Sequence, residues 1–174
     1  MLKHIVSVTG DTIAAFTVVN RQGAVADQPG PSHILRFGEV PFVGSHILPW
    51  EAIAQSTIDE YRSRRQRSII LIGYSTGGRS VLEMAAYLNT AKVPVQLVVI
   101  IDGSSGPPVA PNIRKLVNFY VFNGYGGPIT RQTNFRGSLE NIPVKDSNVG
   151  HFSIIDAKER QLLSYVMSAA RSGL

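Results

Sequence analysis

The sequence contains no cysteine among its 174 residues. That absence excludes disulfide bonds, thiolate metal sites and a cysteine nucleophile together. Charged residues are scarce at 17%, whereas hydrophobic residues reach 44%, a composition typical of a folded globular chain rather than a disordered one. Hydrophobic runs are short, and none approaches the roughly 20 residues that a membrane-spanning helix needs. We therefore expect a single domain over residues 1–174, with no membrane span.

The basic residues and the N-terminus indicate which partners and locations are not expected. The net charge is +5, and one basic cluster, within residues 62–67, falls at the end of a predicted helix, where cations suit the negative end of the dipole. Aromatic residues do not interleave with it beyond Tyr61, so we expect no nucleic-acid partner. Residues 1–12 lack the long apolar region and cleavage site of a signal peptide. We expect a cytoplasmic protein, with secretion of a processed form left open.

Strand and helix patterns alternate along the chain. Apolar and β-branched runs predict strands at residues 3–8, 33–37, 69–72, 95–101, 117–122 and 139–144. Helical spacing of apolar residues predicts helices over 13–19, 50–65, the stretch around 81–88, and 156–170, the last with Asp156 and Glu159 as a capping box. Such alternation predicts an α/β fold: a doubly wound, mostly parallel sheet of about six strands with helices on both faces.

The sequence G-Y-S-T-G at residues 73–77 lies between a predicted strand and a predicted helix. A G-x-S-x-G in this context is typical of a nucleophile elbow, a sharp turn that projects the serine hydroxyl above the end of the sheet. The flanking glycines leave room where strand and helix nearly touch. Ser75 is therefore the candidate nucleophile, and the alternative is a serine that merely caps the helix.

A serine hydroxyl needs a base to take its proton, and the base needs a carboxylate to orient it. Asp102 follows the next strand along the chain, and His151 follows the last one. Because the carboxyl ends of parallel strands meet at one edge, Ser75, Asp102 and His151 are predicted to lie together. The order serine, acid, histidine is that of α/β-hydrolases.

Other residues compete for these roles. Asp146, just before His151, is the second candidate for the acid, although a turn in K-D-S-N explains it as well. Three further histidines, His4, His33 and His46, come before the elbow, where a base in this chain order is not expected.

Backbone N–H groups are needed to stabilise the oxyanion. One is expected from Thr76, directly after the nucleophile, and another from the turn at Gly10 and Asp11 after the first strand. The aromatic residues Tyr74, Tyr125 and Phe152 are candidates for apolar contact with the substrate, and each could equally be structural.

The motifs GYSTGG, IIDGSSG and NVGHFSI together resemble those of a minimal α/β-hydrolase. The chain lacks the first two strands of the full fold, as cutinases and the smallest bacterial lipases do. Only about 14 residues separate Asp102 from the strand predicted at 117–122, too few for a helical lid. The acid follows the strand after the elbow, 102 − 75 = 27 residues beyond the serine. In this placement it resembles thioesterase domains that release acyl or peptidyl chains from carrier proteins, which implies an acyl-carrier partner.

These inferences predict a lipase-like serine esterase or thioesterase that hydrolyses short to medium acyl chains through an acyl-enzyme, without metal or organic cofactor. Two alternatives remain. The same triad could transfer the acyl group to an alcohol or amine, or the fold could be an inert binding or scaffold module with an unreactive serine.

Overall fold

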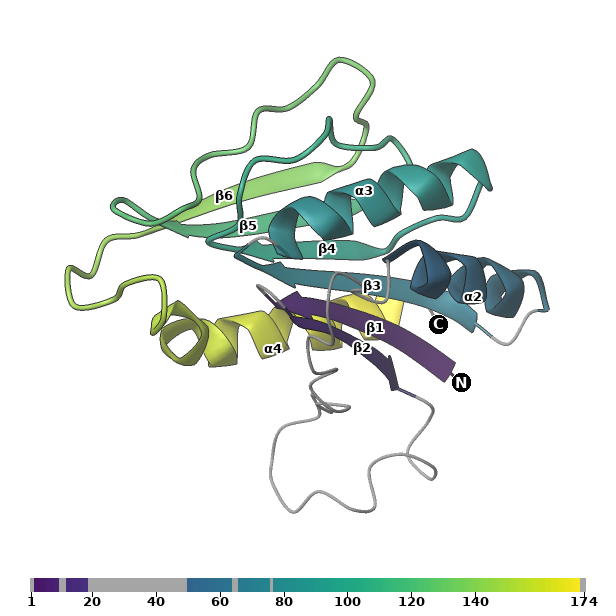
Figure 1. Ribbon diagram of the computed structural model, residues 1–174, viewed down its shortest axis with the longest axis horizontal. Helices are drawn as coiled ribbons and strands as arrows, with labels where there is room; N and C mark the ends of the chain where they lie inside the picture. Colours follow the sequence, from purple (N-terminus) through teal and green to yellow (C-terminus); the bar gives the residue numbers. More distant parts are fainter. Residues whose placement is uncertain (1, 10–11, 19–49, 64–65, 76, 173–174) are drawn as a thin grey trace.

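A computed structural model describes residues 2–9, 12–18, 50–63, 66–75 and 77–172. Within them, one sheet has the strand order β2-β1-β3-β4-β5-β6 (Figure 1). Its strands are β1 (Leu2–Thr9), β2 (Thr12–Val18), β3 (Gln66–Tyr74), β4 (Leu97–Ile101), β5 (Lys115–Val121) and β6 (Ser138–Val144). β1 and β2 pair antiparallel, and every other neighbouring pair is parallel. The predicted α/β class with a mostly parallel sheet is confirmed.

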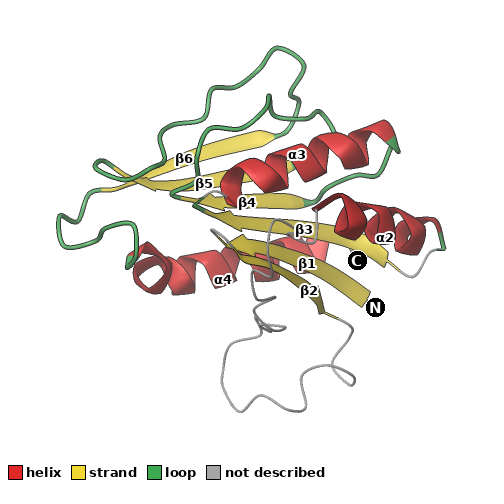
Figure 2. Ribbon diagram, in the orientation of Figure 1, coloured by secondary structure: helices red, strands yellow, loops and turns green. Residues whose placement is uncertain are grey.

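Helices cover both faces of this sheet. α2 (Trp50–Arg62) and α3 (Gly77–Thr90) lie on one face, and α4 (Ile154–Ser172) lies on the other (Figures 1 and 2). The helix predicted around residues 81–88 is thus α3, and that predicted over 50–65 is α2.

The buried residues of β3 and β4 alternate between two apolar clusters. Ile69 and Leu71 of β3 belong to the cluster under α2 and α3, whereas Ile70 and Ile72 belong to the cluster under α4. All five residues of β4 are buried, because alternate side chains enter the two clusters. Since both faces are covered, these strands appear in the sequence as unbroken apolar runs. This packing on both faces holds β3 and β4 in place, and the candidate site lies at their carboxyl ends.

Residues 13–19 were predicted to be helical, and this is wrong, because β2 occupies them up to Val18. The pairing joins Thr9 to Thr12, so the contact is local and requires only a two-residue connection. β-branched residues such as Ile13 and Thr17 suit a strand, and pairing with β1 outweighs the weak helical spacing. The strand predicted at 33–37 lies outside the described residues.

The strand order reverses once, at β1, because β2 lies on one side of it and β3 on the other, as in a doubly wound sheet. β2 departs from the parallel pattern, since it pairs antiparallel with β1. The connections from β4 to β5 and from β5 to β6 contain no helix, so α4 alone among the described helices covers the second face. α4 also begins two residues before the predicted start, which places Asp156 in its first turn instead of at its cap.

Candidate active site

Ser75 and Asp102 leave two neighbouring strands at the same level. In the parallel pairing of β3 with β4, Tyr74 lies opposite Ile101. Ser75 therefore follows β3 at the same level at which Asp102 follows β4. The N–H of Ser75 donates to the carbonyl of Ile101 at 3.1 Å, and the N–H of Asp102 donates to the carbonyl of Phe119 in β5 at 2.7 Å. Sheet hydrogen bonds therefore hold both backbones one step beyond their strands.

Both residues also have an unusual backbone. The φ angles of Ser75 and Asp102 are 56° and 42°, and among the described non-glycine residues only Lys92 shares a positive φ. This left-handed region is costly for residues with a side chain and persists where surrounding contacts enforce it. At Ser75 the carbonyl accepts hydrogen bonds from the N–H groups of Gly78 and Ser104, each at 3.0 Å. The turn has the local geometry of a nucleophile elbow.

Glycine is required at this turn for close packing. A Cβ at Gly73 would overlap the backbone of Gly77, and a Cβ at Gly78 would overlap the Cα of Gly103. The glycines of the motif therefore let α3 start against the end of β3 and against the loop after β4.

The carboxylate of Asp102 is fully buried and has a complete set of hydrogen-bond donors. Oδ1 accepts from the backbone N–H groups of Val121 at 3.3 Å and Gly126 at 3.1 Å, and Oδ2 accepts from that of Tyr125 at 3.1 Å. Nδ1 of His151 lies 2.6 Å from Oδ2. Three segments that are distant in sequence thus converge on one side chain.

Burial acts on the pKa of Asp102 more strongly than any one contact and would raise it. The hydrogen bond from His151 and the three backbone N–H donors together outweigh this effect, and the pKa of Asp102 is lowered from its usual value. Asp102 is therefore a carboxylate at neutral pH, able to fix one tautomer of the histidine and to stabilise its protonated form.

This lowered pKa predicts that Asp102 stabilises the fold at neutral pH and loses that effect in acid. Because the folded pKa lies below the unfolded value of about 3.9, its contribution is complete above that value and disappears as the pH falls through the folded pKa. Urea unfolding of the wild type and of Asp102→Asn between pH 7 and pH 2.5 should show a stability difference that narrows below about pH 4. A difference that stays constant down to pH 2.5 would contradict the lowered pKa.

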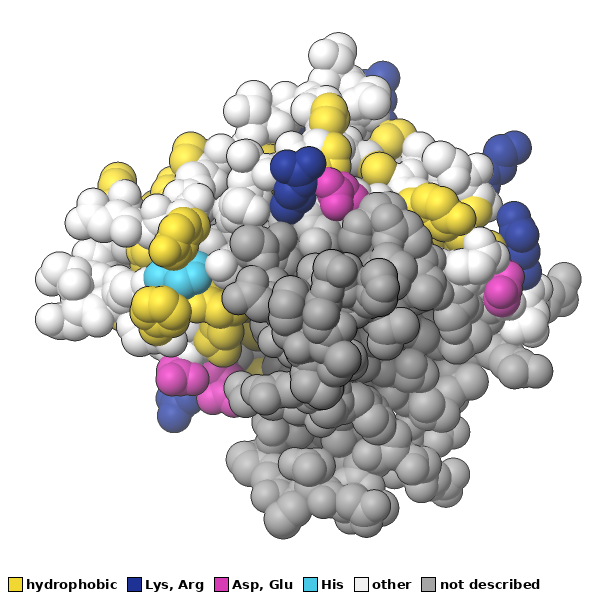
Figure 3. Space-filling model, viewed as in Figure 1, with side chains coloured by type: hydrophobic (Ala, Val, Ile, Leu, Met, Phe, Trp, Pro, Cys, Tyr) yellow, Lys and Arg dark blue, Asp and Glu magenta, His cyan; other side chains and the backbone are white. Residues whose placement is uncertain are grey.

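His151 lies in the loop between β6 and α4, and aromatic rings surround it. The ring of Tyr74 stacks on the imidazole at 4.8 Å with an interplanar angle of 21°, while Tyr125 and Phe152 approach at 4.6 and 5.2 Å, both in edge-to-face geometry. In Figure 3 a cyan histidine side chain lies among yellow hydrophobic ones at the surface. Phe152 and Tyr125 are 89% and 71% exposed, so two of the three rings around His151 face solvent.

Tyr74 additionally ties the histidine loop to the elbow strand. Its hydroxyl donates to the backbone carbonyl of His151 at 2.9 Å. Burial first, and then the negative charge of Asp102, raise the pKa of Tyr74, so this hydroxyl keeps its proton. The residue directly before Ser75 therefore fixes both the loop and the ring of His151.

The second ring nitrogen of His151, Nε2, is the one that remains for proton transfer, because Nδ1 faces Asp102. Among the described residues, no hydrogen bond joins Ser75 and His151. Contacts between a catalytic nucleophile and its base can tighten in the Michaelis complex.

The remaining site predictions have mixed outcomes. Asp146 is exposed, and its carboxylate and carbonyl accept from the N–H groups of Asn148 and Val149 within its own turn, as the alternative reading of K-D-S-N suggested. The predicted oxyanion residues Thr76, Gly10 and Asp11 lie outside the described residues.

Sequence reasoning missed the loop that holds Asp102. Tyr125 and Gly126 supply backbone donors, and a Cβ at Gly124 would overlap the carboxylate. The signal was present in N-G-Y-G-G directly after a predicted strand, because repeated glycines there indicate close approach of a backbone to another group.

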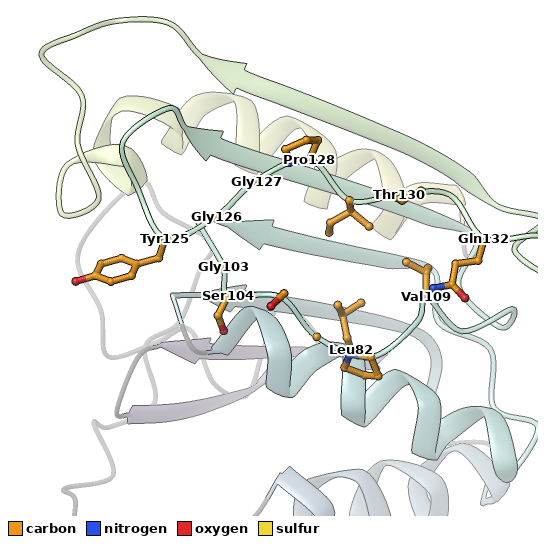
Figure 4. Close-up of a pocket in the computed structure, with 14 residues that line it drawn as sticks. Leu82, Gly103, Ser104, Val109, Tyr125, Gly126, Gly127, Pro128, Thr130 and Gln132 are labelled. Atoms are coloured by element: carbon orange, nitrogen blue, oxygen red, sulfur yellow. The ribbon is translucent and has the colours of Figure 1, made fainter.

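A pocket of about 380 Å³ opens beside the candidate triad. Its walls are the loop after β4, the loop after β5 and Leu82 of α3 (Figure 4). Tyr125 and Ser104 lie at one end, and Val109 and Gln132 lie at the other. Of the three aromatic residues predicted to contact substrate, Tyr125 lines this pocket, whereas Tyr74 and Phe152 do not.

Within the described part of the chain, no group of three or more histidine, aspartate or glutamate side chains could hold a metal ion. None of the helices described above combines the length and apolar character needed to cross a bilayer.

A mostly parallel sheet with a sharp strand-to-helix turn at a serine gives the chain a hydrolase-like fold. The structure is similar to that of the type II thioesterase BorB from the borrelidin biosynthetic cluster, with a TM-score of 0.52, 11% sequence identity and 70% of each chain covered. At this identity the likeness shows a hydrolase-like fold and nothing of substrate. Neither a protein-family model nor a curated protein matches the chain.

Proposed function

We propose that this protein is a serine acyl hydrolase that cleaves carboxylic esters or thioesters. The observation that carries the proposal is the 2.6 Å contact between His151 and the buried carboxylate of Asp102, at the sheet edge where Ser75 sits in a strained turn. A buried carboxylate that orients an imidazole beside an elbow serine is the arrangement that activates a hydroxyl nucleophile.

In the proposed mechanism, His151 accepts the proton of Ser75 through Nε2 as the hydroxyl oxygen attacks the carbonyl carbon of the substrate. Asp102 stabilises the imidazolium that forms. His151 then returns the proton to the leaving alcohol or thiol as the bond to it breaks, which leaves an acyl-enzyme. Water, deprotonated by the same histidine, attacks the carbonyl carbon of the acyl-enzyme. The bond from this carbon to the Ser75 oxygen breaks, His151 returns the proton to that oxygen, and the carboxylic acid leaves.

The negative oxygen of the tetrahedral intermediates needs donors of its own. We assign the backbone N–H of Thr76 to this role, because it follows the nucleophile at the start of α3, where the helix dipole favours negative charge. A second donor is proposed from the turn at Gly10 and Asp11, which follows β1, the parallel neighbour of β3.

Two considerations direct the choice of substrate. The connection from Asp102 to β5 spans residues 103–114, too short for a helical lid, so we propose an open site that acts on short to medium acyl chains. The acid follows the strand after the elbow, a placement that resembles thioesterase domains, and on that resemblance we propose thioesters, including acyl groups presented by a carrier protein, alongside simple esters.

An active-site fluorophosphonate probe tests this proposal. We expect the native protein to be labelled and the heat-denatured protein not to be, because only the assembled triad makes the serine reactive. Tryptic digestion and mass spectrometry should place the label on the peptide of residues 68–79, at Ser75. Native protein that stays unlabelled would instead indicate a binding module on the same fold.

A further inference from the structure

Resting on the proposed hydrolase function, we infer that the pocket beside the triad is its specificity subsite. It takes an uncharged portion of the substrate that carries hydrogen-bonding groups, such as a hydroxylated or amide-containing chain, in preference to a plain hydrocarbon chain or a charged group. The inference depends on where the pocket lies, what lines it and how firmly its wall is held.

The pocket begins at the reacting groups. Ser104, which lines it, donates its N–H to the carbonyl of Ser75 at 3.0 Å. Tyr125, at the same end, contacts the imidazole of His151 with its ring and the carboxylate of Asp102 with its N–H. A group attached to the scissile carbonyl can therefore enter the pocket while the carbonyl itself remains at Ser75.

The lining determines what kind of group fits. None of the described residues that line it has a charged side chain, so a charged substituent would lose its hydration without gaining a partner among them. Apolar surface comes from residues such as Leu82, Val109 and Ile129, while side-chain hydroxyl and amide groups come from Ser104, Ser105, Thr130 and Gln132. A pure hydrocarbon would leave these polar groups without partners, whereas a neutral group with hydroxyl or amide functions would pair with them.

One wall of the pocket is fixed by two asparagines. Asn118 of β5, 1% exposed, donates through Nδ2 to the carbonyl of Gly127 at 2.8 Å and to Oδ1 of Asn141 in β6 at 2.9 Å. Asn141 in turn accepts from the N–H of Ile129 and donates to its carbonyl, both at 2.9 Å. Residues 126–129 are thus anchored between Asp102 and the two strands, and a preformed wall lowers the ordering cost of binding.

Gly127, which lines the pocket, offers a position to add bulk there without disturbing that wall. A Cβ built there meets no atom within 4 Å, whereas one at Gly126 would press on the backbone of Asp102. Asn118 bonds to the backbone carbonyl of Gly127, which any side chain would leave in place.

The experiment compares Gly127→Leu with the wild type on paired p-nitrophenyl esters, one acetyl and one with a 3-hydroxyacyl chain of six carbons. We expect the ratio of kcat/KM for the longer ester to that for acetate to fall at least tenfold in Gly127→Leu. Ser164→Leu, which adds the same side chain on the exposed surface of α4, should leave the ratio within twofold of the wild type. Thermal unfolding and fluorophosphonate labelling of each variant establish that it is folded and reactive.

A second variant, Gln132→Leu, tests the polar character at similar side-chain volume. The ratio of kcat/KM for the 3-hydroxyacyl ester to that for the unsubstituted acyl ester of equal chain length should fall about fivefold or more. A parallel series, in which the alcohol is varied and the acyl group stays acetyl, decides which portion of the substrate enters the pocket. If the size effect appears in the alcohol series, the subsite binds the leaving group, and the inference holds for that portion.

Two results separate failure of this inference from failure of the proposed function. A labelled, active protein whose ester ratios are unchanged by both Gly127→Leu and Gln132→Leu overturns the subsite alone. A wild type that neither reacts with the probe nor hydrolyses any ester overturns the hydrolase proposal and the subsite with it.

Discussion

Replacing Ser75 with alanine is expected to lower kcat for ester hydrolysis about a millionfold. The hydroxyl is the atom that forms the acyl-enzyme, and no neighbouring group can substitute for it in the same position. The protein should remain folded, because the backbone carbonyl of Ser75, and not its hydroxyl, bonds to Gly78 and Ser104. Steady-state hydrolysis of p-nitrophenyl acetate measures the loss, and unfolding in urea measures the stability.

Ser147→Ala provides the matched control, because Ser147 is an exposed serine in the loop before His151. Its kcat should equal that of the wild type within experimental error. Retention of more than one hundredth of wild-type activity in Ser75→Ala would contradict the assignment of the nucleophile and direct attention to another serine, such as Ser104 or Ser105 at the pocket.

The convergence of Ser75, Asp102 and His151 at one edge was predictable from the sequence because strand periodicity is a strong local signal. β4 is an unbroken apolar run, and its end, like that of β3, is marked by a change to glycine and polar residues. In a parallel sheet the residues after such runs share an edge. Topology therefore predicts that Asp102 and the loop of His151 lie at one edge, whereas the bond between the two side chains depends on the path of that loop.

The loops themselves were not predictable, because their contacts depend on distant backbone groups. Nothing local in the sequence indicates that Asn118, in the middle of β5, bonds to Gly127 and to Asn141 in β6. Tyr74 was a candidate for contact with substrate or for a structural role, and the sequence did not indicate that its hydroxyl bonds to the carbonyl of His151 and its ring stacks on the imidazole. Both cases involve side chains whose partners lie in another strand or loop.

The same reasoning explains the error at β2. Residues 13–18 have no strong alternation of polar and apolar side chains, so periodicity gave weak guidance. Pairing with β1 over seven residue pairs decided the outcome through backbone hydrogen bonds, which every sequence can form. Prediction succeeded where side-chain pattern dominates and failed where main-chain pairing dominates.

Asp102 combines the predictable and the unpredictable parts of the site. Its position at the sheet edge was predicted from the strand pattern, whereas the loop contacts that hold its carboxylate were not predicted. Asp102→Asn is expected to lower kcat about ten-thousandfold. An amide in place of the carboxylate no longer stabilises the imidazolium and, with its NH₂ toward Nδ1, selects the wrong tautomer of His151. In either orientation the NH₂ group also faces a backbone N–H, of Tyr125 or of Val121 and Gly126, so the fold should lose about 1–3 kcal/mol.

Asp146→Asn is the matched control, since it makes the same change in an exposed turn of the loop before His151, and its kcat should stay within twofold of the wild type. Activity is measured on folded protein, verified by circular dichroism and by the urea midpoint, so that lost stability is not mistaken for lost catalysis. A partial return of activity at high pH, where hydroxide can replace the histidine as the base, would support the role of Asp102 in assisting His151. A large loss in Asp146→Asn with little change in Asp102→Asn would transfer the role of the acid to Asp146.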